Sequence, residues 1–135
     1  MKIMVLDGQG GGMGKILVGS IRATFPNIEI LAVGTNSSAT YQMLKAGADN
    51  SATGENAVIV GARKSDIIIG PIGMVIADSL YGEITPAMAL AISQSKAKRI
   101  LIPVNHCDNL VAGISDLSMN KLIESAIELI RDNLT

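Results

Sequence analysis

Residues 2–15 read KIMVLDGQGGGMGK, an apolar run followed by a loop in which five of the seven positions 8–14 are glycine. The run Lys2–Asp7 is typical of a parallel strand that is buried on both faces. Apolar residues then recur at helical spacing from Met13 to Phe25, where a proline follows. Glycines let backbone N–H groups approach an anion, and a helix N-terminus adds a favourable dipole. This order predicts a phosphate or nucleotide site formed by Gly8, Gln9, Gly10, Gly11, Gly12, Met13, Gly14 and Lys15.

The rest of the chain alternates short apolar runs with helical patterns. Further strands are expected at Ile28–Val33, Ala48–Ser51, Asp66–Ile69 and Arg99–Val104. Helices are expected at Ala39–Ala46, Thr53–Ala62, Thr85–Ser95 and Ser118–Asp132, with Thr53 and Thr85 as N-caps. The alternation predicts one Rossmann-like domain over residues 1–135. Its fold class is a doubly wound three-layer α/β sandwich around a mostly parallel sheet of about five strands.

Three more loops are expected to join the glycine loop, because ligands of such sheets bind beyond the carboxyl ends of the strands. These loops are Gly34–Ser38, Gly70–Gly73 and Asn105–Asn109. Cofactor-binding residues are expected there at Thr35, Asn36, Gly70, Pro71, Ile72, Gly73 and Asn105. Two of the loops have a purely structural alternative: Gly34–Ser38 holds N-cap residues for the next helix, and Gly70–Gly73 would make a rigid turn.

The spacing of the glycines favours a nicotinamide dinucleotide. Gly8, Gly12 and Gly14 fit the G-x-x-x-G-x-G spacing of short-chain dehydrogenases and reductases, whereas Met13 breaks the G-x-G-x-x-G pattern. The expected cofactor is therefore NAD or NADP, and the structural alternative is a plain strand-to-helix turn.

An ATP-like nucleotide is the second ligand class. A P-loop would place Gly14 and Lys15 well, but it requires a glycine where Gln9 stands and a hydroxyl where Ile16 stands. Without that hydroxyl a magnesium ligand is missing, so a standard ATPase is disfavoured.

The second strand ends without the acid that usually holds the ribose hydroxyls of NAD. Residues 33–38 read VGTNSS, so the polar side chains there are hydroxyls and an amide. Such groups could hold the 2′-phosphate of NADP, although no arginine accompanies them. Glu29 lies too early in the strand to replace the acid.

Catalytic residues stay unassigned. His106 and Cys107 follow the last expected strand, but a single histidine and a single cysteine predict no metal site and no disulfide. Glu55, Asp78 and Glu83 are the other carboxylates near the expected crevice. Since Glu83 lies just before the Thr85 cap, it is a candidate partner for the dipole of the following helix. Each of the three carboxylates is also a candidate general base, which the spacing does not assign.

Composition narrows the class of protein. The chain has 135 residues, a net charge of −1, 48% hydrophobic and 17% charged residues. This balance excludes a disordered chain and disfavours a nucleic-acid binder that works through a basic field.

The apolar run 67–77 is too short for a membrane span, so a cytoplasmic protein without membrane partners is expected. High apolar content on a small body, including the run 67–77 and the helix at Thr85–Ser95, predicts a homodimer.

Several long motifs resemble a family of short, uncharacterised bacterial proteins with a domain of unknown function. They are DGQGGGMGK at 7–15, SATGENAV at 51–58, IIIGPIGMVIADSLYGEITPAMALAI at 67–92 and ILIPVN at 100–105. The resemblance implies a stand-alone Rossmann-like domain in a bacterial cytosolic protein. Its motif residues here are Gly8–Lys15, Thr53–Asn56, Gly70–Gly73, Asp78–Pro86 and Asn105. It implies no activity, substrate or catalytic residue.

Three classes of function remain open at this point. The first is a protein that binds a dinucleotide or a related phosphate ligand; if it is an enzyme, it is an NAD(P)-dependent oxidoreductase. The second is a non-catalytic subunit that senses a nucleotide. The third is a hydrolase or transferase with a divergent P-loop.

Overall fold

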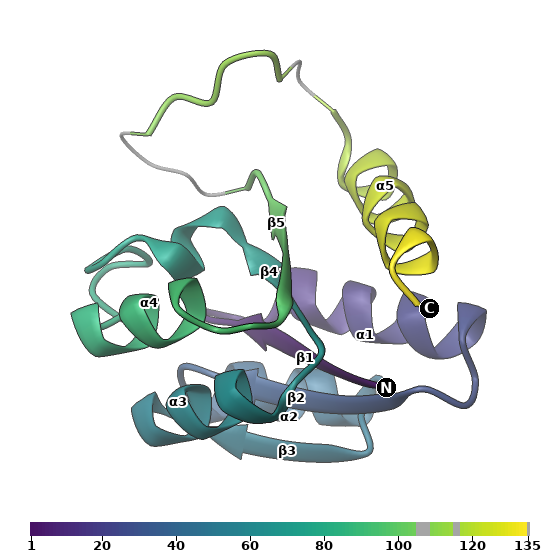
Figure 1. Cartoon of the computed structure of the whole chain (residues 1–135), viewed down its shortest axis with the longest axis horizontal. Coiled ribbons are helices and arrows are strands. Elements are labelled where there is room, and N and C mark those ends of the chain that lie inside the picture. Colours follow the sequence, from purple (N-terminus) through teal and green to yellow (C-terminus); the bar gives the residue numbers. More distant parts are fainter. Residues whose placement is uncertain (105–108, 115–116, 135) are drawn as a thin grey trace.

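The structure is a computed structural model that describes residues 1–104, 109–114 and 117–134 (Figure 1). Five strands and five α-helices alternate, with one 3₁₀ helix after the fourth strand. The strands are β1 (Lys2–Asp7), β2 (Glu29–Gly34), β3 (Asn50–Thr53), β4 (Ile67–Pro71) and β5 (Lys98–Ile102). The helices are α1 (Gly12–Thr24), α2 (Ser37–Lys45), α3 (Glu55–Lys64), η1 (Ile72–Val75), α4 (Pro86–Ser93) and α5 (Met119–Asp132).

The strands form one sheet in the order β3-β2-β1-β4-β5, and every pairing is parallel. The chain winds from β1 outward to β3 and then crosses back to β4 on the other side of β1. The winding therefore reverses between β1 and β4, which is where ligands of doubly wound sheets bind. Here the carboxyl end of β1 runs directly into the glycine loop at positions 8–14.

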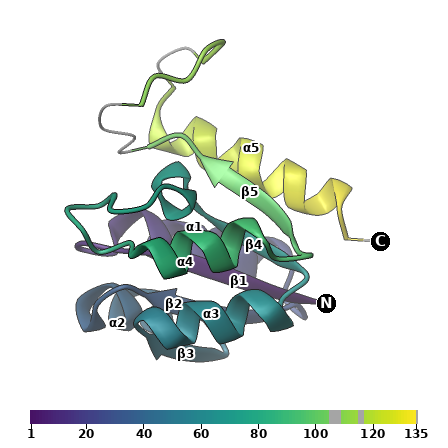
Figure 2. The same ribbon diagram turned by 60° about the vertical axis from the view of Figure 1, so that its left-hand side comes forward.

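Two hydrophobic cores cover the two faces of the sheet. One joins the sheet to α1, α5 and Met43 of α2, and the other joins it to α3 and α4. Figure 2 shows α3 and α4 in front of the sheet and α1 and α5 behind it. The Rossmann-like three-layer α/β class expected from the sequence is confirmed.

The N-cap assigned to α3 is wrong. Thr53 is the last residue of β3, and its hydroxyl lies 2.7 Å from the hydroxyl of Thr40. The N-cap position belongs to Gly54, whose φ of 98° is open to glycine but strained for other residues. By contrast, Thr85 caps α4 as expected, since its hydroxyl accepts the N–H of Met88 at 3.2 Å.

The first part of the apolar run 67–77 is buried inside the chain, whereas Ala77 at its end is exposed. All five residues of β4 are buried, so this part of the run offers no surface to a partner. In α4 only one face is buried, through Met88, Ala89 and Ile92, whereas Leu90 is 54% exposed. No helix within the described ranges combines the length and the apolar character needed to cross a membrane.

Candidate functional site

The glycine loop is closed around the carboxylate of Asp7, the last residue of β1. One oxygen of Asp7 accepts the N–H of Gly8 at 2.8 Å, and the other accepts the N–H of Gly14 at 2.7 Å. The side chain is therefore a brace that ties both ends of the loop to the end of the strand. Burial raises the pKa of Asp7; the two N–H donors lower it in part, and the negative charge of Glu83 raises it further.

Three of the five loop glycines have a structural cause. A Cβ at Gly8 would lie 2.7 Å from the Thr35 hydroxyl, and one at Gly14 would lie 2.7 Å from the sulfur of Met43. Gly11 has a φ of +76°, and a Cβ there would meet the backbone of Ala39 at 2.7 Å. At these positions the alternative interpretation, a tightly packed turn, accounts for the glycine.

Gly10 and Gly12 have no such cause. Both are exposed, neither has a positive φ, and a Cβ would meet nothing within 4 Å. In the described part of the chain, the N–H groups of Gly10, Gly12 and Met13 have no acceptor. Since Gly12 and Met13 are the first two residues of α1, their N–H groups carry the positive end of the helix dipole.

A cavity of about 240 Å³ lies against these groups. We call it the loop cavity. Its lining consists of Asp7, Gly8, Gln9, Gly10, Gly11, Gly12, Met13, Leu80 and Met119. Ligand sites are commonly about 300–1,000 Å³. The loop cavity is thus large enough for a phosphate group and its neighbouring atoms, and a whole dinucleotide would extend beyond it.

Glu83 reaches this loop from far along the chain. Its Oε1 accepts the N–H of Gln9 at 2.8 Å, the hydroxyl of Thr35, and the amide of Asn36 at 3.1 Å. The expectation that Glu83 serves the dipole of α4 is therefore wrong: its carboxylate lies across the sheet end, at the ends of β1 and β2. Partial burial raises the pKa of Glu83, but the bonds from Gln9, Thr35 and Asn36 outweigh this and hold the pKa below its usual value.

A strained segment positions Glu83. Asp78, Leu80 and Tyr81 all have left-handed φ angles, of 67°, 56° and 55°. Each such non-glycine residue costs about 1–3 kcal/mol, a strain that is typical of functional sites. Buried Leu80 and Ile84 hold the segment in the core on either side of Glu83.

The remaining expected residues lie in different parts of the structure. Thr35 and Asn36 meet the glycine loop, and Asn36 also caps α2 through the N–H of Ala39 at 2.9 Å. Lys15 is exposed on α1. In the Gly70–Gly73 stretch, residues Gly70, Pro71 and Gly73 are buried and only Ile72 is partly exposed. Asn105, His106 and Cys107 lie outside the described residues.

The turn 70–73 has a packing cause. A Cβ at Gly70 would lie 2.7 Å from the carbonyl oxygen of Leu6, and one at Gly73 would lie 3.0 Å from the hydroxyl of Ser79. That hydroxyl donates to the carbonyl of Gly73. The described contacts of these two glycines are packing contacts, one at the end of β4 and one in η1.

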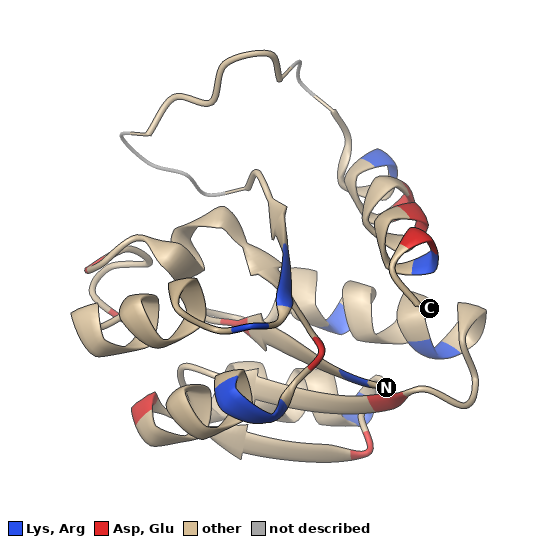
Figure 3. Ribbon diagram, in the orientation of Figure 1, with Lys and Arg blue, Asp and Glu red and all other residues tan. Residues whose placement is uncertain are grey.

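The ionised side chains that hold the glycine loop are carboxylates. Figure 3 shows Lys and Arg on helices and strands in several parts of the molecule. Among the described residues, the ionisable side chains that hydrogen-bond to the loop at positions 8–14 are the carboxylates of Asp7 and Glu83. The cation of Lys15 follows the loop on an exposed part of α1. Within the described ranges, no group of three or more His, Cys, Asp or Glu residues could hold a metal ion.

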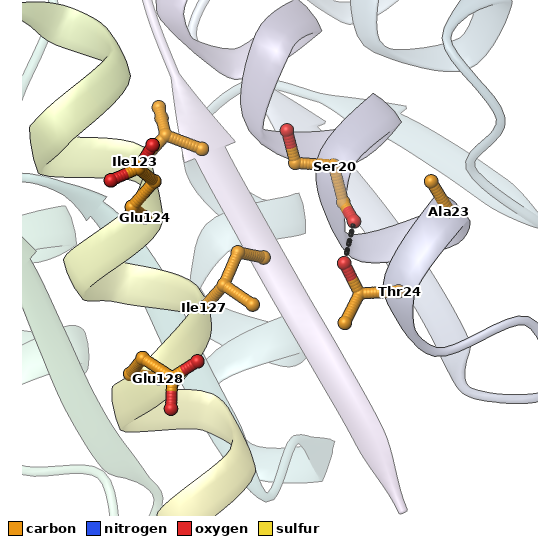
Figure 4. A pocket seen from close by; sticks show the side chains of 7 residues that line it. All are labelled: Ser20, Ala23, Thr24, Ile123, Glu124, Ile127 and Glu128. Atoms are coloured by element: carbon orange, nitrogen blue, oxygen red, sulfur yellow. Dashed lines mark hydrogen bonds between the residues drawn. The ribbon is translucent and has the colours of Figure 1, made fainter.

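A second cavity, of about 530 Å³, lies between α1 and α5 (Figure 4). It is lined by Ser20, Ala23, Thr24, Ile123, Glu124, Ile127 and Glu128. The Thr24 hydroxyl is turned back onto the Ser20 carbonyl at 2.8 Å, and the two carboxylates would repel an anion. Its chemistry does not suit a phosphate, although its volume is larger than that of the loop cavity.

The parallel sheet, its switch point and the glycine loop define a Rossmann-like α/β protein. Within that class the chain belongs to the family DUF3842, a domain of unknown function, whose family model matches residues 2–135. No curated protein shows significant similarity to the chain.

One similar solved structure is a dodecameric FMN-dependent UbiX-like decarboxylase from Escherichia coli O157:H7. The TM-score is 0.50 and the sequence identity is 22%, over 95% of this chain and 76% of the decarboxylase chain. At this identity the similarity supports the fold alone.

Proposed function

We propose that the protein binds a nucleotide cofactor of the nicotinamide dinucleotide type, NAD or NADP, with a phosphate at the head of α1. One observation carries the proposal: Gly10 and Gly12 are glycines without a packing or backbone cause, and they lie beside N–H groups without an acceptor among the described residues. A phosphate in close contact with the backbone would explain both facts, because a side chain at either position would exclude it.

The acidic surroundings favour a dinucleotide over a phosphate monoester. A monoester carries a charge of about −1.5 to −2 at neutral pH on one phosphorus. A pyrophosphate bridge carries a single negative charge on each phosphorus, so the one phosphate group at the head of α1 would carry less charge beside Asp7 and Glu83 than a monoester in the same place. This argues for NAD or NADP before FMN, the cofactor of the similar decarboxylase, and before the terminal phosphate of an ATP-like nucleotide.

A thermal-unfolding panel tests the proposal directly. The wild-type protein is scanned with NAD, NADH, NADP, NADPH, FMN, ATP with magnesium, S-adenosylmethionine and inorganic phosphate. A ligand at 100 times its dissociation constant stabilises the folded state by about 2.7 kcal/mol. A shift with a nicotinamide nucleotide supports the proposal, and a panel without any shift contradicts it.

Gly12→Val is expected to abolish the shift without unfolding the protein. Its side chain would project beside the first N–H groups of α1, where a Cβ meets nothing within 4 Å. We expect the Tm without ligand to stay within about 2 °C of the wild type, because surface substitutions usually cost less than 0.5 kcal/mol.

Gly19→Val is the matched control. Gly19 lies in the same helix and also has open space around its Cβ position, but it is far from the loop cavity. It should bind the ligand as the wild type does. Wild-type affinity in Gly12→Val would contradict the proposed site.

An oxidoreductase and a nucleotide sensor would share this site. They differ in turnover: the oxidoreductase changes the redox state of the bound nicotinamide in the presence of a substrate, whereas the sensor changes its assembly or partner affinity on binding. A divergent P-loop enzyme would instead release phosphate and require magnesium.

We also propose that two copies associate through the outer face of α4. Leu90 is 54% exposed there, and Tyr81, in the segment before α4, is 97% exposed. Sedimentation equilibrium at micromolar concentration is expected to give the mass of a dimer, and Leu90→Glu should shift it toward the monomer. A monomeric wild type would contradict this proposal.

A further inference from the structure

The end of β2 lacks its own acid, but the fold supplies one from another segment. Glu83 stands 48 residues after Thr35 and 47 after Asn36, yet its Oε1 accepts a hydrogen bond from each of these side chains. In dinucleotide-binding folds, the acid that accepts the ribose hydroxyls stands at this strand end. The carboxylate of Glu83 therefore lies at the end of β2, where the residues that directly follow the strand have only hydroxyl and amide side chains.

One oxygen of Glu83 is engaged and the other is free for a ligand. Oε1 accepts all three hydrogen bonds, and Oε2 makes no hydrogen bond or ion pair with another described residue. Among the described side chains, no buried polar atom lacks a hydrogen-bond partner, so Oε2 is in contact with solvent. The same carboxylate holds the N–H of Gln9, which lines the loop cavity. Glu83 is therefore one hydrogen bond away from the lining of the cavity in which we propose that the phosphate binds.

The groups that could hold a 2′-phosphate are already in use. Thr35 and the Asn36 amide donate to Glu83, and the same amide also donates to the carbonyl of Gln9 at 2.9 Å. None of the hydrogen bonds of this described cluster comes from Lys or Arg. Because its hydrogen bonds stabilise the charged form, Glu83 presents a negative charge at neutral pH.

We infer that Glu83 is the specificity-determining residue of the nucleotide site: it accepts the 2′- and 3′-hydroxyls of a ribose and excludes a 2′-phosphate. The ligand class is thereby narrowed to nucleotides with an unmodified ribose diol, NAD rather than NADP. This inference rests on the proposed function of the glycine loop.

Glu83→Gln tests the inference by removing the charge and keeping the shape. The amide oxygen of glutamine can still accept from Gln9, Thr35 and Asn36, so the fold of the loop should persist. The dissociation constants of NAD and NADP are measured by calorimetry for both proteins. The wild type should prefer NAD by about 10- to 100-fold, the range expected for a hydrogen bond to a charged group. The variant should lose at least about tenfold of that preference.

Glu29→Gln is the control, since Glu29 is exposed at the opposite end of the same strand. It should keep the wild-type preference for NAD. A second measurement varies the ligand and needs no variant: NAD should bind the wild type more tightly than the NAD analogue that lacks the 2′-hydroxyl of the adenosine ribose.

The possible failures are distinct. If the wild type binds neither NAD nor NADP, the proposed function is overturned and the inference falls with it. If the wild type binds NAD but prefers NADP, or if Glu83→Gln keeps the wild-type ratio, the inference alone is overturned.

Discussion

Asp7→Ala is expected to lower the free energy of unfolding by about 2–4 kcal/mol, because it leaves the N–H groups of Gly8 and Gly14 without an acceptor. Each buried N–H group left without an acceptor lowers the free energy of unfolding by about 1–3 kcal/mol. Part of this loss is offset because the variant no longer buries a carboxylate. The side chain is only 7% exposed, so water cannot readily replace it. Urea unfolding with a constant m-value measures the change.

Asp66→Ala provides the matched control. Asp66 also accepts a backbone N–H, that of Lys2 at 2.8 Å, but at an exposed site at the other end of β1. Its loss should cost no more than about 1 kcal/mol. Equal losses in the two variants would contradict the role of Asp7 as the brace of the loop.

The same residue predicts a pH dependence. Because burial raises the pKa of Asp7 in the folded state, the folded protein takes up this proton at a higher pH than the unfolded chain does. Its contribution to stability therefore increases as the pH falls through the folded pKa toward about 3.9, the ordinary value. The stability of the wild type relative to Asp7→Asn should rise over this interval, and a constant difference would contradict the raised pKa.

Gly34→Ala is expected to destabilise the fold by about 3 kcal/mol. A Cβ at Gly34 would lie 2.5 Å from the backbone nitrogen of Thr40 and 2.7 Å from the carbonyl oxygen of Asn36. Backbone atoms cannot rotate away, so the start of α2 would have to move. That movement would displace Asn36 from both Gln9 and Glu83, and it should weaken ligand binding as well.

Gly19→Ala should have the opposite effect. Nothing lies within 4 Å of its Cβ position, and alanine is favoured over glycine in a helix by about 0.8–1 kcal/mol. Thermal unfolding should lower the Tm of Gly34→Ala by about 10 °C and raise that of Gly19→Ala by a few degrees. Two shifts of the same sign would refute the assignment of Gly34 to a close backbone contact.

The fold could be predicted from the sequence because its signals are local. Three of these signals are consecutive in the sequence: the apolar run at 2–7, the glycine loop and the helical spacing after Met13. The structure has β1 and α1 where they were expected. Thr53 misled the prediction because a threonine before glycine suits both a strand end and an N-cap. The choice depended on Thr40, whose hydroxyl meets that of Thr53 across the end of β3.

The candidate site was predictable only in part. Five clustered glycines indicate a close approach of backbone to something, but the sequence does not say to what. Packing partners such as Thr35, Ala39 and Met43 distinguish the structural glycines from Gly10 and Gly12. Glu83 was assigned to the nearest helix, because the sequence carries no signal for a contact with Gln9, 74 residues away.

The position of Glu83 in the sequence, after β4, also bears on when the candidate site forms during folding. Gln9 and Thr35 belong to the first strand–helix–strand unit, whereas Glu83 becomes available only after β4 has paired with β1. Because the loop-closure entropy of such non-local pairing is lost before the contacts form, we expect this step to be slow. We therefore expect an early folding species to have the glycine loop without the carboxylate of Glu83. The ligand discrimination that we propose for Glu83 would then depend on the completed sheet.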